Sequence, residues 1–204
     1  PFPPLYELTL LPWLGSQDAA SATLWANYFW LALLIVAVWG VGWLYAGPLE
    51  GLAAAALVSC APEAQWLARN HLSDLPLAAW IASSYFALAW SAGFLRWGGS
   101  LLFGACVAAA FLTKWSAWTY LFPAAVIWTR ALSSSLTRRR ALAAFGLAVA
   151  ACAPWYLPHV PILLPRLVEA SADQAVPVWK GWAALSYLWI LLRGLDTPFW
   201  IFGV

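Results

Sequence analysis

The feature that most constrains this chain is a set of long stretches without any charged residue. Leu24–Tyr45 is the clearest of them, and Leu75–Leu95 is equally free of Asp, Glu, Lys and Arg. A helix needs about 20 mostly apolar residues to cross a bilayer, so both stretches are long enough. Tryptophans lie towards the ends of the first stretch, where amphipathic rings favour the membrane interface. The pattern predicts membrane-spanning helices.

The composition agrees with a membrane protein and excludes other classes. Hydrophobic residues make up 64% of the chain and charged residues 9%, whereas soluble domains average roughly 45–50% and 25%. A soluble domain and a disordered chain are therefore excluded. The net charge of +2 is too small for nucleic-acid binding, so no nucleic acid is a predicted partner. The three cysteines have no zinc-type spacing, which favours a packing role.

Two further spans are predicted from apolar runs that are flanked by helix breakers or charge. The first is Leu49–Leu67, which follows Gly47-Pro48. The second is Ala141–Leu157, which is preceded by the Arg138–Arg140 triplet and ended by Pro154 and Pro158. Proline and glycine at these positions indicate where helices begin and end.

The stretch Leu101–Trp128 leaves two alternatives. One continuous helix would put Lys114 near the bilayer centre, at a cost of about 2.5–3.5 kcal/mol. Two short helices would instead bring Lys114 to a water-facing turn. This hairpin also gathers Arg96, Arg130 and Arg138–Arg140 on one side of the membrane, which the positive-inside rule makes cytoplasmic. The distribution of charge therefore favours the hairpin.

Together these runs predict an all-α fold, a polytopic membrane helix bundle of about six complete spans plus the start of another near Pro198. Residues 1–204 are expected to form one partial domain, with a first span upstream of Pro1 and a missing C-terminal part. We predict that residues 1–22 and 158–196 are extracytoplasmic segments. Each is expected to contain a juxtamembrane helix, Leu5–Leu14 in the first and Trp182–Leu192 in the second.

The predicted extracytoplasmic side holds nearly all the polar groups that are suited to chemistry. Its most polar turn runs from Arg69 through His71 to Asp74. Asp74 either caps the following helix or binds a metal or an acceptor while Arg69 neutralises a phosphate. Lys114 either extends to the interface or holds a phosphate as a point charge. The run Pro3-Pro4-Leu5-Tyr6-Glu7 is either a surface anchor or a wall around a lipid-borne substrate.

Five short motifs occur in a fixed order along the chain. They are Pro3-Pro4-Leu5-Tyr6, Gly47-Pro48-Leu49, Arg69 to Asp74 with Leu75-Pro76-Leu77, Phe111-Leu112-Thr113-Lys114-Trp115, and Ala153-Pro154-Trp155-Tyr156. This order resembles polyprenyl-phosphate-sugar-dependent membrane glycosyltransferases of the GT-C type, such as protein O-mannosyltransferases and lipid A aminoarabinose transferases. The resemblance covers most of the chain.

The resemblance implies an enzyme that transfers a sugar from a polyprenyl-phosphate donor to a protein, lipid or glycan acceptor. The reaction would take place on the extracytoplasmic face of a membrane, and the composition suggests a bacterial inner membrane. By resemblance, Asp74 matches a second acidic catalytic site that can take a divalent metal ion, the one cofactor considered. The main catalytic carboxylate would lie upstream of Pro1. The residues implied in donor-phosphate binding are Lys114 and Arg69, and those in the substrate loop are Pro3, Pro4, Tyr6, Glu7 and His71.

Two other classes of function stay open on the sequence. A lipid or solute transporter would need polar residues lining a path at mid-depth. The two cleanest spans carry no charge, which counts against ion or proton transport. A membrane scaffold without catalysis is the third reading.

Overall fold

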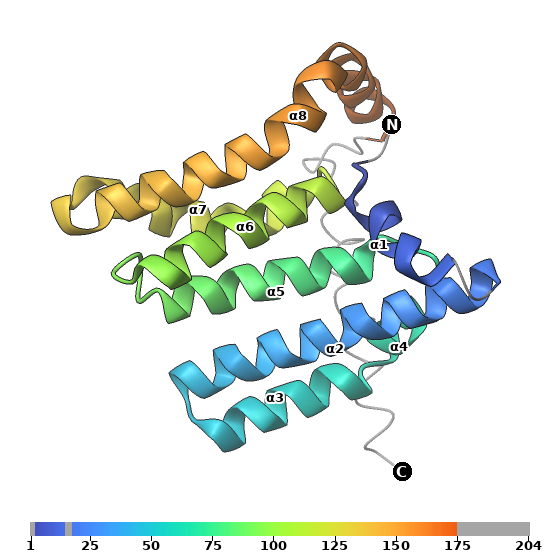
Figure 1. Cartoon of the computed structure of the whole chain (residues 1–204), viewed down its shortest axis with the longest axis horizontal. Coiled ribbons are helices and arrows are strands. Elements are labelled where there is room, and N and C mark those ends of the chain that lie inside the picture. Colours follow the sequence, from blue (N-terminus) through green and yellow to red (C-terminus); the bar gives the residue numbers. More distant parts are fainter. Residues whose placement is uncertain (1–2, 15–17, 175–204) are drawn as a thin grey trace, which may run out of the picture. The chain divides into compact units, whose positions relative to one another are not determined.

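A computed structural model describes residues 3–14 and 18–174, and these residues form eight α-helices (Figure 1). The helices are α1 (Leu5–Leu14), α2 (Ala19–Tyr45), α3 (Pro48–Cys60), α4 (Pro62–Ala68), α5 (Asp74–Trp90), α6 (Trp97–Thr113), α7 (Ala117–Ser133) and α8 (Ser135–Gln174). Phe2–Trp155 forms one compact unit, and the chain from Tyr156 onward belongs to a second. The helix predicted at Trp182–Leu192 and the span predicted from Pro198 lie outside the described residues.

The sequence explains how the longest helix of the first unit begins and ends. Asp18 is the N-cap of α2, because its Oδ1 accepts a hydrogen bond from the Ser21 amide at 2.7 Å. That bond stabilises the carboxylate and lowers the pKa of Asp18. After Tyr45 the chain turns at Gly47, whose φ of +132° suits a residue without Cβ. Pro48 then occupies the first turn of α3, where its missing N–H costs nothing.

Two of the described helices contain segments long and apolar enough to cross a membrane, Ala20–Tyr45 and Ser135–Leu163. This indicates membrane association. The prediction of about six complete spans is wrong, because the other apolar runs are divided into shorter helices. Leu49–Leu67 breaks at Ala61, where the following Pro62 disfavours helical backbone. Leu75–Leu95 ends as a helix at Trp90.

The turn after α5 has a left-handed backbone over three residues. Ala92, Gly93 and Phe94 have φ angles of 50°, 68° and 71°, a region that side chains with Cβ rarely adopt. Ser91 holds the turn, because its Oγ accepts a hydrogen bond from the Phe94 amide at 2.9 Å and donates one to the Leu88 carbonyl at 2.7 Å. An apolar stretch can thus contain a tight turn, which the count of apolar residues did not detect.

The other predicted boundaries have mixed outcomes. The hairpin is confirmed, because α6 ends at Thr113, Lys114 is its C-cap, and α7 begins at Ala117. The helix predicted at Leu5–Leu14 is present, although Leu8 and Leu11 are exposed beside Glu7 and its outer face is therefore largely apolar. The break predicted at Pro158 is wrong, because α8 continues to Gln174.

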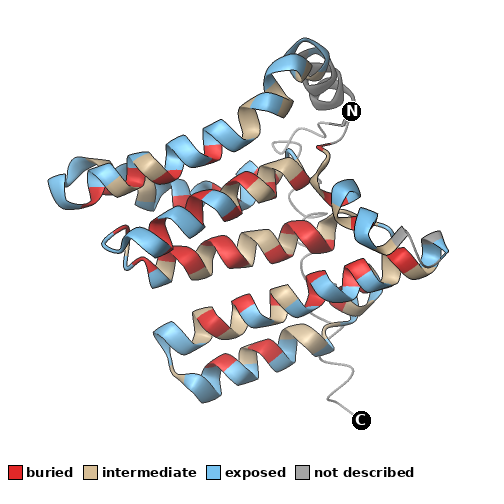
Figure 2. Cartoon of the chain, viewed as in Figure 1, coloured by how far each residue is buried: buried red, intermediate tan, exposed pale blue. Residues whose placement is uncertain are grey.

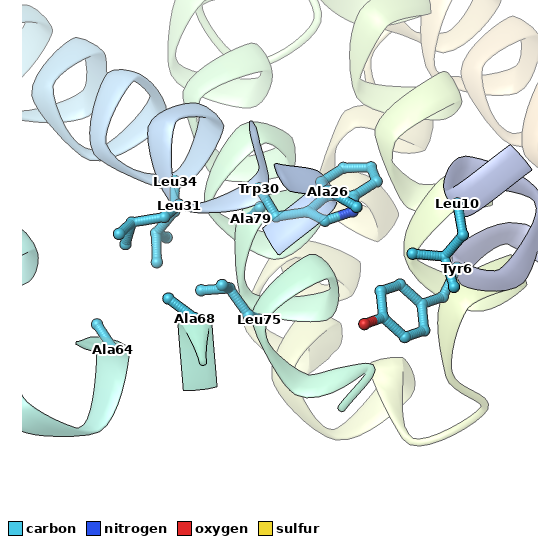
Figure 3. Close-up of a cluster of buried hydrophobic side chains, with 10 residues drawn as sticks. All are labelled: Tyr6, Leu10, Ala26, Trp30, Leu31, Leu34, Ala64, Ala68, Leu75 and Ala79. Atoms are coloured by element: carbon cyan, nitrogen blue, oxygen red, sulfur yellow. The ribbon is translucent and has the colours of Figure 1, made fainter. Parts of the chain in front are cut away.

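Figure 2 shows buried residues along α5 and α6. The core of the first unit is built mostly from alanine and leucine side chains, together with a few aromatic ones. Figure 3 shows the cluster that joins α1, α2, α4 and α5, with Trp30 and Leu75 at its centre. A second cluster joins α5 to α7 and the first half of α8 around Phe94 and Phe103. Alanine and glycine let the helices approach closely; a Cβ at Gly51 of α3 would lie 2.6 Å from the Trp39 carbonyl oxygen of α2.

Candidate functional site

An ion pair joins two of the residues singled out in the sequence. Lys114 Nζ donates a hydrogen bond to Asp74 Oδ1 at 2.8 Å. Asp74 is the first residue of α5 and Lys114 the C-cap of α6, so the antiparallel packing of these two helices brings together residues that are distant in sequence. The lysine side chain is 27% exposed and the aspartate side chain 45% exposed. Charge-assisted hydrogen bonds of this kind are stronger than neutral ones.

A cavity of about 330 Å³ lies beside this pair. Asp74 contributes to its lining, and the other walls come from the apolar face of α5 and from Tyr120 of α7; the remaining lining residues are Leu77, Ala78, Ile81 and Ala82. Tyr85 fastens the two helices, because its hydroxyl donates a hydrogen bond to the Tyr120 carbonyl at 2.7 Å. The cavity therefore combines one carboxylate with mostly apolar walls, which suits a ligand that has one polar end.

A second polar cluster connects α1, α2 and the turn before α5. The Tyr6 hydroxyl donates a hydrogen bond to Asn27 Oδ1 at 3.2 Å and lies 3.3 Å from His71 Nδ1. Thr23 Oγ1 lies 3.4 Å from the same ring nitrogen. On the other side of the ring, His71 Nε2 is 3.7 Å from Glu7 Oε1. Three residues predicted for a substrate loop, Tyr6, Glu7 and His71, are thus in contact.

Burial separates the members of this cluster. Tyr6 is only 3% exposed, whereas the side chains of His71 and Glu7 are 51% and 65% exposed. Burial, with a smaller contribution from the negative charge of Glu7, raises the pKa of Tyr6 to about 12, and the hydrogen bond with Asn27 opposes that rise. Tyr6 is therefore a neutral hydroxyl at physiological pH.

Asn27 is the member of the cluster that the sequence analysis missed. It is fully buried in α2, within the stretch that was interpreted as a clean span. Its Nδ2 donates hydrogen bonds to the Asn70 carbonyl at 2.8 Å and to the Leu67 carbonyl at 3.5 Å. One amide side chain in an otherwise apolar run was the available signal, since a buried amide needs partners.

The remaining predicted site residues take no part in these contacts. Arg69 is the C-cap of α4 and is exposed, and its side chain has no ion pair with another residue in 3–14 or 18–174. The structure does not bring it to Asp74. Pro3 and Pro4 precede α1, and the Pro4 carbonyl accepts the Leu8 amide in its first turn. Pro3 is buried.

The residues around Asp74 do not fit a divalent metal ion. The contact that the carboxylate makes is with an ammonium group, which already supplies the positive charge. Within the part of the chain that the structure describes, no three His, Cys, Asp or Glu side chains gather in a way that could hold a metal ion. Hard divalent cations need several oxygen ligands, which the described part of the chain does not gather around Asp74.

A second cavity, of about 350 Å³, lies between α6, α7 and the first half of α8. Its lining is almost entirely carbon, with Phe103, Phe111, Trp118 and Phe145 among the large side chains.

Compared with known proteins, the chain matches no family model, no curated protein and no solved structure.

Proposed function

We propose that this chain is a membrane glycosyltransferase that takes a sugar from a polyprenyl-phosphate donor at the end of the unit where Asp74 and Lys114 meet. The observation that carries the proposal is the ion pair between Lys114 and Asp74, the latter of which lines a cavity with otherwise mostly apolar walls. A polyprenyl-phosphate sugar has the matching chemistry, a long apolar chain joined to an anionic phosphate.

Lys114 would bind the donor phosphate. An ammonium group that is 27% exposed can exchange part of its contact with Asp74 for a phosphate oxygen. As the bond between the sugar and the phosphate breaks, negative charge grows on the departing lipid phosphate, and a positioned cation stabilises that charge. Asp74 would hold the ammonium in place and would accept a hydrogen bond from a sugar hydroxyl.

The apolar cavity between α6, α7 and α8 supports a lipid-borne substrate. Its lining offers no polar partner to a sugar or an ion, whereas hydrocarbon gains about 25 cal/mol for each Å² removed from water. Trp118 lies in α7, the helix that follows the Lys114 turn, so this cavity begins close in sequence to the phosphate-binding residue. We assign the cavity to hydrocarbon of the donor.

The distribution of arginine supports an orientation. Arg96, Arg130 and Arg138–Arg140 lie at the turns opposite to the Asp74 end of the helices, and the positive-inside rule places such residues on the cytoplasmic side. The reaction would then occur on the extracytoplasmic face of a bacterial inner membrane. In a cysteine-free background, an impermeant maleimide should label Ser73→Cys but not Ser134→Cys in intact cells.

The proposal is tested with the full-length protein in lipid nanodiscs and a radiolabelled undecaprenyl-phosphate sugar. Lys114→Ala should weaken donor binding at least tenfold, and Asp74→Asn should reduce transfer. Arg130→Ala is the matched control, since it removes one exposed cation from the other end. A wild-type protein that neither binds nor consumes the donor would contradict the proposal, and transport or scaffolding would then be the better reading.

A further inference from the structure

The orientation of the Asn27 amide sets the direction of the hydrogen bonds around it. Its Nδ2 faces the Asn70 carbonyl at 2.8 Å and the Leu67 carbonyl at 3.5 Å, and carbonyl oxygens only accept. The reversed amide would place two oxygens against each other in a fully buried position. Oδ1 must therefore face the Tyr6 hydroxyl.

The Tyr6 hydroxyl has a single proton, and Asn27 Oδ1 accepts it at 3.2 Å. The proton is retained, because the pKa of Tyr6 is raised to about 12. Towards its second partner, His71 Nδ1 at 3.3 Å, the phenol oxygen can act only as an acceptor. Thr23 Oγ1 lies 3.4 Å from the same nitrogen, and its hydroxyl can either accept from it or donate to it. The hydrogen bond from Tyr6 to Asn27 therefore favours a proton on Nδ1.

This arrangement determines the other nitrogen of the ring. In a neutral imidazole one nitrogen carries the proton and the other has a free lone pair. With Nδ1 protonated, the lone pair is on Nε2, 3.7 Å from Glu7 Oε1 and on a side chain that is 51% exposed. As in a catalytic triad, an acceptor at Nδ1 would orient the ring so that its outer nitrogen accepts a proton. The Glu7 carboxylate differs from a triad carboxylate because it lies at that outer nitrogen; since it only accepts, it favours the ring once Nε2 has taken up the proton.

We propose that His71 is a catalytic residue, the general base that activates the acceptor hydroxyl, and that Tyr6 and Asn27 are its positioning residues. The proposal rests on the proposed function. Nε2 takes the proton as the acceptor O–H bond breaks, and the acceptor oxygen forms a bond to the sugar carbon. The bond from that carbon to the phosphate oxygen breaks, and its electron pair leaves with the polyprenyl phosphate. The Glu7 carboxylate stabilises the imidazolium that results.

The charged and titratable groups near the His71 ring come from α1 and from the stretch of chain that holds His71 itself. Tyr6 and Glu7 face it from α1, while α2 contributes Thr23, which does not titrate. Arg69 and Asp74 lie on the same stretch of chain, and Asp74 is paired with Lys114.

The tautomer can be measured without any activity. The full-length protein, labelled with ¹⁵N-histidine in nanodiscs, is studied by NMR at alkaline pH. His71→Gln assigns the signal by difference, and His159→Gln should leave it in place. Nδ1–H in the wild type, with a mixture of tautomers in Tyr6→Phe, supports the proposal. Nε2–H in the wild type overturns it.

The kinetic test uses the radiolabelled undecaprenyl-phosphate sugar. His71→Ala should lower kcat about 100-fold or more with donor KM unchanged, and added imidazole should restore part of the rate. An unchanged kcat would overturn the role of His71 and leave the proposed function intact. A wild type that consumes no donor would overturn the proposed function instead, and the tautomer would still decide whether Nε2 is set to accept a proton.

Discussion

The two ends of the Phe2–Trp155 unit satisfy their charged groups in different ways. At one end, near the α4–α5 and α6–α7 turns, side chains pair with side chains, as Lys114 does with Asp74. At the other end, arginines bind backbone carbonyls. Arg138 Nε donates to the Leu132 carbonyl at 2.8 Å, and an Arg140 Nη donates to the Leu136 carbonyl at 2.9 Å.

This difference in how the charged groups are paired bears on which end of the unit is better suited to catalysis. Mutually paired groups are held in place and can exchange a partner for a substrate. Arginines bound to carbonyls keep their full positive charge, which suits contact with anionic lipid headgroups. Arg140 also lies over the Trp97 ring, with 5.6 Å between its guanidinium carbon and the ring centroid. Under the proposed function, the arginine end would face lipid headgroups and the paired end would face the substrate.

Asn27→Leu should have the largest effect on the paired end. It removes the hydrogen-bond acceptor of the Tyr6 hydroxyl, which keeps only its contact with His71 Nδ1, and it removes the side-chain donor to the Asn70 carbonyl. Each unsatisfied buried group costs about 1–3 kcal/mol. We expect the free energy of unfolding to fall by about 3 kcal/mol in a detergent titration with SDS. Asn70→Ala is the control, because its side-chain amide makes one exposed contact, with the Trp66 carbonyl. Equal stability of Asn27→Leu and wild type would contradict the central role of Asn27.

Alkaline pH should weaken the paired end before the arginine end. The pKa of Tyr6 is about 12 in the folded protein and 10.0 for an ordinary tyrosine, so between these pH values the unfolded chain releases a proton that the folded chain keeps. Stability is then complete below pH 10 and falls towards pH 12, by about 2 kcal/mol. The measurement is the unfolding free energy against pH for wild type and Tyr6→Phe. Parallel curves for the two proteins would refute the prediction.

The Asp74–Lys114 pair should contribute a smaller amount. A cycle of Asp74→Asn, Lys114→Gln and the double variant should give a coupling energy of about 1 kcal/mol, because the pair is partly exposed. Added salt should reduce the coupling, since solvent ions screen exposed charges. A coupling that does not respond to salt would mean that the pair is shielded from solvent.

Arg140→Gln should have the smallest effect, a loss of about 0.5 kcal/mol from the contact with Trp97. Arg139→Gln is the matched control, because Arg139 is exposed and is the central arginine of the same triplet. Thermal unfolding in detergent would measure both. A larger loss for Arg139 than for Arg140 would mean that the net charge of this end matters more than the ring contact.

The predictions that succeeded concern short-range signals. The hairpin at Lys114 follows from the high cost of a charge inside the bilayer, and the structure confirms it. The predicted number of membrane spans is wrong because it depends only on the length of the apolar runs. Pro62 and Gly93 carried the information that the runs are divided, since proline and glycine mark turns even in apolar sequence.

The candidate site was predicted as separate residues and not as contacts. Asp74 and Lys114 were singled out for their charge, and Tyr6, Glu7 and His71 for their place in polar segments. Which of them meet was beyond the sequence, as Arg69 shows, because it is near Asp74 in sequence but forms no pair with it. Asn27 was overlooked because one uncharged polar residue hardly changes the hydropathy of a long run.

The sequence by itself determined the helical character of this protein, its apolar surface and the segregation of arginine, because these depend on local composition. Only the tertiary structure decided that Tyr6, Asn27 and His71 form a chain of hydrogen bonds and that Lys114 pairs with Asp74. The physical reason is that hydrogen bonds act over about 3 Å. Such contacts exist only once packing has brought α1, α2, α5 and α6 into place.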